Sequence, residues 1–144
     1  MKKHRIVVAD DSQPFLERLT SFLAAEFDIV ATAIDGKTAL NLIRHHQPDL
    51  AVLDLHMPTL SGIEVARELA KSSPGLPIVI CSMETDPDIV EAARKAGANY
   101  VFKMKIETDL IAALKSAALG TPSCEALSRP TVPIQNVDRE LREA

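Results

Sequence analysis

Five short apolar runs, rich in Val and Ile, constrain the fold of this chain more than any other feature. They cover residues 6–9, 29–33, 50–53, 78–81 and 100–102 and are nearly continuous in apolar side chains. Strands that are buried on both faces have this composition, and such strands belong to parallel sheets. We therefore expect five parallel strands that are covered on both sides.

Amphipathic stretches of helical period follow each run. Each opens with a side chain suited to cap a helix, namely Ser12, Asp35, Ser61, Asp86 and Thr108. Gly97 and Gly120 stand where the fourth and fifth helices are expected to end. Strand–helix alternation repeated five times predicts an α/β sandwich with right-handed crossovers.

The alternation stops near Gly120, and the composition then changes. Residues 121–144 contain Pro122, Pro130 and Pro133 and no long periodic stretch. We expect one domain at residues 1–120 and a flexible tail at 121–144, because a chain of 144 residues leaves little room for a second domain.

Charge and hydropathy argue against several classes of function. A net charge of −4 disfavours binding to nucleic acid or to a membrane surface through charge alone. No apolar stretch approaches the roughly 20 residues of a membrane-spanning helix, and the first residues lack the apolar region of a signal peptide. Cys81 and Cys124 have no metal or redox spacing, so we expect two free thiols in the cytoplasm.

Polar side chains stand at the carboxyl ends of the predicted strands. Asp10 and Asp11 follow the first run, Asp54 the third, Ser82 the fourth and Lys103 the fifth. Open parallel sheets bind ligands at this edge. Each acid alone also suits a helix cap or a turn, but three clustered carboxylates repel one another unless a cation or a lysine neutralises them. Hard oxygen ligands with open positions suit Mg²⁺.

A motif begins at Asp54. The run at residues 54–62 resembles the D-x-x-M-P-x-x-x-G segment of receiver domains in two-component response regulators. The other positions of that family follow in order, namely Asp10, Asp11, Ser82, Tyr100 and Lys103. The resemblance covers about residues 3–120 and implies a flavodoxin-like doubly wound fold with strand order 2-1-3-4-5.

The resemblance also implies a chemistry for the acidic site. Asp54 would accept a phosphoryl group, with Asp11 and Asp54 bound directly to Mg²⁺. Asp10 would act through a bound water, and the backbone carbonyl of His56 would be a further ligand. The protein would then be a phosphoacceptor switch and not an enzyme that turns over other molecules.

Three further residues would couple the phosphoryl group to a change of conformation. Lys103 would pair with a phosphoryl oxygen, Ser82 would hydrogen-bond the group, and Tyr100 would turn inward. The side chains of His56 and Glu84 would flank the path of water to the acyl phosphate. Taken singly, Lys103 also suits a solvated strand end and Tyr100 a core aromatic.

The partners implied are a sensor histidine kinase or phosphotransfer protein and a downstream protein in the cytoplasm. The downstream partner, or a second copy of the chain, would bind the fourth helix, fifth strand and fifth helix. We expect neither direct nucleic-acid binding by this chain nor membrane association.

The sequence departs from the usual receiver pattern at the fifth strand. Met104 stands where many receivers have Pro after the lysine, and Gly97 to Lys103 is one residue shorter than usual, with Lys105 as the alternative lysine. The segment that begins at Lys103 is similar to receivers with LuxR-type outputs. A truncated DNA-binding regulator is therefore the alternative to a stand-alone receiver.

Two other classes of protein fit less well. A phosphatase with an Asp nucleophile would carry a second Asp two residues later, where this chain has His56. A flavin-binding domain would need a Ser-, Thr- and Gly-rich loop after the first strand. Without a metal, Asp10 and Asp11 would instead repel a phosphate group.

Overall fold

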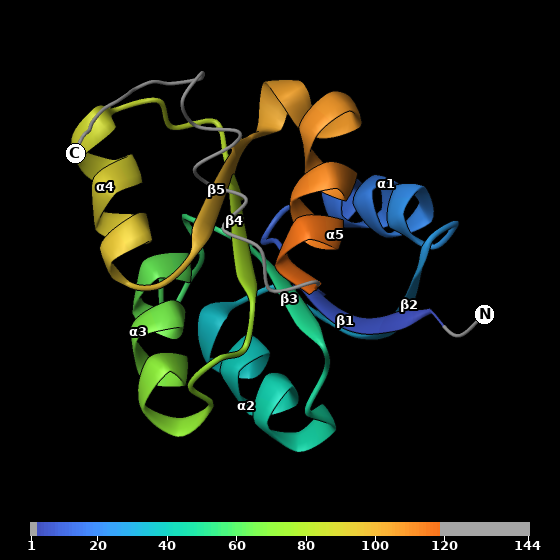
Figure 1. The fold of residues 1–144 in the computed structure, drawn as a ribbon, viewed down its shortest axis with the longest axis horizontal. Coiled ribbons are helices and arrows are strands. Elements are labelled where there is room, and N and C mark those ends of the chain that lie inside the picture. Colours follow the sequence, from blue (N-terminus) through green and yellow to red (C-terminus); the bar gives the residue numbers. More distant parts are fainter. Residues whose placement is uncertain (1–2, 119–144) are drawn as a thin grey trace.

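The computed structural model describes residues 3–118 and shows a five-stranded sheet between two layers of helices (Figure 1). The strands are β1 (His4–Ala9), β2 (Phe27–Ala33), β3 (Leu50–Asp54), β4 (Ile78–Ser82) and β5 (Asn99–Phe102). The helices are α1 (Gln13–Leu23), α2 (Gly36–His46), α3 (Gly62–Ser72), α4 (Pro87–Lys95) and α5 (Ile111–Ala118). All strand pairs are parallel, in the order β2-β1-β3-β4-β5, which confirms the predicted fold.

Each face of the sheet has its own apolar core. Helices α2, α3 and α4 pack on one face, against side chains such as Val7, Leu53 and Ile80. Helices α1 and α5 pack on the other face, against side chains such as Ile6 and Val52. Successive residues of one central strand enter opposite cores, which is why these strands are continuous in apolar residues.

The two edge strands are more exposed than the sequence predicted. Every residue of β3 and β4 is buried, but in β2 only Phe27 and Ala33 are buried, and in β5 only Val101. The prediction of burial on both faces is therefore wrong for the runs at 29–33 and 100–102. An edge strand has one neighbouring strand, and the helix layers cover the centre of the sheet more fully than its margins.

Most of the predicted helix starts are confirmed. The N-caps of the first four helices are Ser12, Asp35, Ser61 and Asp86, and each side chain accepts a hydrogen bond from a backbone N–H of the first turn. Gly97 follows α4 with a φ of +95°, a left-handed conformation that suits a residue without Cβ. The caps satisfy backbone donors that would otherwise have no partner.

Thr108 does not begin the last helix. A 3-10 turn at Lys103–Lys105 and a π-helical turn at Ile106–Leu110 lead from β5 into α5. The Thr108 hydroxyl lies 3.2 Å from the carbonyl oxygen of Lys105 and donates to it. Helical turns thus begin directly after β5, and Thr108 lies inside the π-helical turn and not at the start of a helix.

Gly120, Cys124 and the predicted tail at 121–144 lie outside the described residues. Between residues 3 and 118, no helix combines the length and the apolar character needed to cross a membrane. Cys81 lies buried in β4 as a free thiol.

Candidate functional site

The acidic residues meet where β1 and β3 end side by side. Ala9 pairs with Leu53, so Asp10 and Asp54 leave the sheet next to each other. Asp10 is 1% exposed and Asp54 6% exposed, whereas Asp11 is exposed. One carboxylate oxygen from each of the three lies within 4.8 Å of the others. The fold therefore brings the three predicted carboxylates into one cluster.

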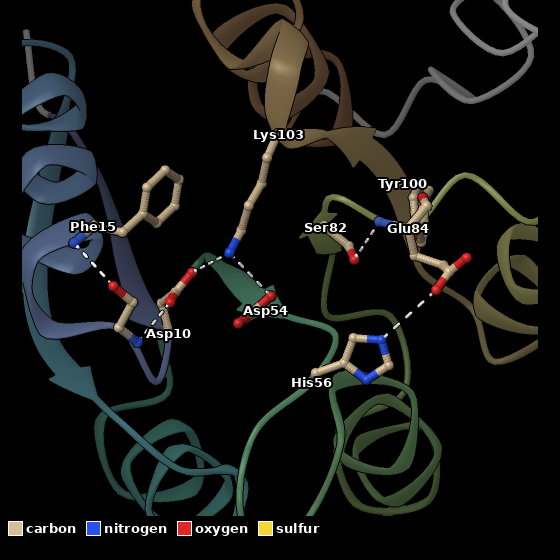
Figure 2. Close-up of polar contacts among 9 residues, drawn as sticks. Asp10, Phe15, Asp54, His56, Ser82, Glu84, Tyr100 and Lys103 are labelled. Atoms are coloured by element: carbon tan, nitrogen blue, oxygen red, sulfur yellow. Dashed lines mark hydrogen bonds and ion pairs between the residues drawn. The ribbon is translucent and has the colours of Figure 1, made fainter.

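Lys103 joins this cluster from the end of β5. Its Nζ lies 2.9 Å from Oδ2 of Asp10 and 3.2 Å from Oδ1 of Asp54 (Figure 2). Phe102 pairs with Ser82, so Lys103 follows the last paired residue of the strand despite the short stretch after Gly97. Lys105, the alternative lysine, lies exposed.

Burial and neighbouring charges shift the pKa values of Asp54 and Lys103. Burial and then the negative charge of Asp10 raise the pKa of Asp54 from 3.8 to about 6, although Lys103 opposes the shift. Burial alone would lower the pKa of Lys103, but its contacts with Asp10 and Asp54 outweigh that effect and leave the pKa raised. At neutral pH Asp54 is thus ionised, and Lys103 neutralises its negative charge only in part.

The loop after Asp54 is held against the end of β3. Gly62 donates its N–H to the carbonyl of Leu55 at 2.8 Å. A Cβ on Gly62 would lie 2.4 Å from the carbonyl oxygen of Asp54, so only glycine fits this approach. Ser61 and Glu64 form a capping box that starts α3 at the same point.

The same loop is tied to the N-terminus of α2. Gly36 donates its N–H to the carbonyl of Pro58 at 3.0 Å, and Lys37 donates its N–H to Oγ1 of Thr59 at 2.9 Å. Thr59 has a φ of +68°, an unfavourable conformation for a β-branched residue. The contact was not expected from the sequence, because Lys37 and Thr59 lie 22 positions apart.

Ser82 and Tyr100 both contact the loop that follows β4. The Ser82 hydroxyl accepts the N–H of Glu84 at 3.0 Å, and the Tyr100 hydroxyl donates to the Glu84 carbonyl at 2.9 Å. The Tyr100 ring is half-buried and meets Phe102 edge to face. Burial raises the pKa of the Tyr100 hydroxyl, so it stays protonated and can donate. Tyr100 is therefore turned toward this loop in the structure.

His56 and Glu84 face each other at the mouth of the site. Nε2 of His56 lies 3.9 Å from Oε1 of Glu84, and the His56 side chain is 75% exposed (Figure 2). His56 follows Asp54 by two residues and Glu84 follows Ser82 by two, so the pair spans the two loops that border the site.

The donor set fits a divalent cation. The three clustered carboxylates offer hard oxygen ligands, and Asp54 carries charge that Lys103 compensates only in part. Mg²⁺ prefers such ligands and retains waters and open positions for a phosphate group. The three carboxylates could therefore hold a metal ion.

Comparison with known proteins identifies the family. The family model of the response regulator receiver domain matches residues 6–115. DegU, a transcriptional regulatory protein of Brevibacillus brevis, is 34% identical over 121 residues, which are 82% of this chain and 51% of that protein. A protein-glutamate methylesterase/protein-glutamine glutaminase of Nitrosospira multiformis is 33% identical over 95% of this chain and 37% of that protein.

Solved structures agree with the sequence relatives. The signal receiver domain of NarL from Mycobacterium tuberculosis superimposes with a TM-score of 0.78 at 33% identity, covering 83% of this chain and 99% of that domain. The chain spans about half or less of the length of the two curated relatives above. The chain belongs to the response regulator receiver family of two-component systems.

Proposed function

We propose that this chain is a phosphoacceptor switch in which Asp54 receives a phosphoryl group from a histidine kinase or a phosphotransfer protein. The observation that carries the proposal is the contact of Asp54 with Lys103, 3.2 Å away, inside a cluster of three carboxylates. A nucleophilic carboxylate beside a lysine and a cation site is the arrangement that phosphoryl transfer requires.

The reaction forms one bond to phosphorus and breaks another. An oxygen of the Asp54 carboxylate attacks the phosphorus, the bond from phosphorus to the donor imidazole nitrogen breaks, and the imidazole departs with that electron pair. Asp54 then carries an acyl phosphate. Lys103 pairs with a phosphoryl oxygen as this group arrives, because its ammonium already lies between Asp10 and Asp54.

Asp11 and Asp54 would hold Mg²⁺ directly, Asp10 would act through a bound water, and the backbone carbonyl of His56 would be a further ligand. When bound, Mg²⁺ supplies positive charge that offsets the charge on the transferred phosphoryl oxygens.

Ser82 and Tyr100 carry the signal away from the site. Ser82 exchanges its bond with the Glu84 N–H for one with the phosphoryl group, and the loop after β4 shifts. Tyr100 follows this loop because its hydroxyl holds the Glu84 carbonyl. The output is a change on the face formed by α4, β5 and α5, which binds a downstream protein or a second copy of the chain in the cytoplasm.

A second candidate is the receiver part of a LuxR-type DNA-binding regulator. It is supported by DegU, which is a transcriptional regulatory protein, and by a LuxR-family response regulator of Aurantimonas sp. SI85-9A1, whose structure superimposes with a TM-score of 0.80 at 26% identity. The discriminating observation is whether the reading frame continues past Ala144 into a DNA-binding domain.

The proposal is tested by intact-mass measurement after incubation with acetyl phosphate and Mg²⁺. We expect the native protein and Asp28→Asn, which changes an exposed carboxylate on β2, to gain one phosphoryl group. Asp54→Asn should gain none. Equal labelling of Asp54→Asn and the native protein would refute the assignment of the acceptor.

A further inference from the structure

The ammonium of Lys103 has a third neighbour besides its two carboxylates. Its Nζ lies 4.4 Å from the centroid of the Phe15 ring, within the range of a cation–π contact. The Lys103 side chain is 15% exposed. Asp10, Asp54 and the Phe15 ring thus surround an ammonium that has little contact with water.

The fold presents Phe15 from the first turn of α1. Ser12 caps this helix, and its hydroxyl accepts the N–H of Phe15 at 3.4 Å. Ser12 in turn donates its N–H to Oδ1 of Asp10 at 2.9 Å. Figure 2 shows the ring beside the lysine, on the side away from Ser82. Asp10 therefore fixes the start of the helix that carries Phe15 and also contacts the lysine that the ring faces.

We infer that Phe15 is a positioning residue for Lys103, an inference that rests on the proposed function of Asp54. A lysine ends in a flexible four-carbon stem, and its ammonium is a strongly hydrated point charge with three donors. Two donors are within reach of carboxylates, and the aromatic face occupies space that water would otherwise fill. The ring excludes water from the Lys103 ammonium and holds it close to Asp54. The positive charge of the ammonium then acts more strongly on an incoming phosphoryl oxygen.

The competing explanation is that Phe15 only fills the core. Its ring does pack against the cluster between the sheet, α1 and α5. Phe22 offers a matched control, because it is a partly buried aromatic residue on the same helix that packs against the same cluster. A purely structural role predicts the same consequences for Phe15→Leu and Phe22→Leu.

The experiment replaces Phe15 by Leu and, separately, by phenylalanines with increasing ring fluorination. Fluorination weakens the negative ring face with little change of shape. We expect Phe15→Leu to lower the maximal rate of phosphorylation by acetyl phosphate about tenfold, with a graded loss along the fluorinated series. Phe22→Leu should leave the rate within about twofold of the native rate. Phe15→Tyr should also keep the native rate, because it retains an aromatic ring.

A second readout does not depend on phosphorylation. In the unphosphorylated protein the ring should shift the Lys103 ε-methylene resonances upfield, and Phe15→Leu should abolish this shift while Phe22→Leu preserves it. A native protein without the shift, a flat fluorinated series, or equal rates for the two Leu variants would overturn the inference. Absence of any phosphorylation of Asp54 would refute the proposed function, and the resonance shift would then decide the Phe15 contact by itself.

Discussion

Replacing Asp54 by Asn is expected to stabilise the metal-free protein at neutral pH, although it removes the acceptor. The pKa of Asp54 is raised by folding from 3.8 to about 6, chiefly by burial and by the charge of Asp10. A carboxyl group with a raised pKa destabilises the folded state when it is ionised. The free energy cost is full above about pH 6 and disappears below about pH 4, where the group is protonated in both states.

The magnitude follows from the size of the shift. Each pKa unit corresponds to about 1.4 kcal/mol, so the ionised Asp54 destabilises the folded state by about 3 kcal/mol at pH 7.5 and by roughly half of that at pH 5. The Asn side chain has similar shape and no charge, and Lys103 retains its shorter contact with Asp10 at 2.9 Å. The variant should therefore gain roughly these amounts over the native protein.

Urea unfolding in EDTA at pH 7.5, 5 and 4 measures the difference. We expect a higher midpoint for Asp54→Asn with an unchanged slope, and a gap that narrows as the pH falls. Adding Mg²⁺ should narrow the gap at pH 7.5, because the ion binds and stabilises the native protein more than the variant. Asp28→Asn is the control for loss of an exposed carboxylate. A variant no more stable than native at pH 7.5 would show that the cluster does not strain the fold.

Three further variants test other contacts by urea unfolding. Lys103→Met should destabilise the metal-free protein by about 3 kcal/mol at pH 7.5, because it leaves two buried carboxylates unpaired. The loss should be much smaller with Mg²⁺, and equal losses with and without the ion would count against this reasoning. Thr59→Asn should stabilise by about 1 kcal/mol, since Asn tolerates positive φ and can still accept the N–H of Lys37; a loss would contradict the strain at this residue. Gly62→Ala should cost about 3 kcal/mol, because its Cβ meets the Asp54 carbonyl; a neutral result would show that the loop yields.

The strands and most helix starts could be predicted from the sequence because their signals are local. A continuous apolar run marks a central strand, and Ser61 followed by Glu64 marks a capping box whichever fold surrounds it. The cluster of Asp10, Asp54 and Lys103 could also be predicted, because the carboxyl ends of neighbouring parallel strands lie at one edge of the sheet.

What could not be predicted depends on contacts between distant segments. The exposure of β2 follows from its place at the sheet edge, which periodicity does not reveal. The helical turns that begin at Lys103 include Thr108, so this residue does not cap a helix. The contact of Phe15 with Lys103 depends on where the ends of β1 and β5 lie in space. No local motif marks that ring as part of the site.

The most direct test of the account locates the phosphoryl group on the chain. The protein is phosphorylated with acetyl phosphate and Mg²⁺, the acyl phosphate is reduced with borohydride, and peptide mass spectrometry identifies the residue converted to homoserine. We expect conversion at Asp54 alone, with Asp10 and Asp11 unchanged. Conversion at either of those two residues, with Asp54 intact, would contradict it.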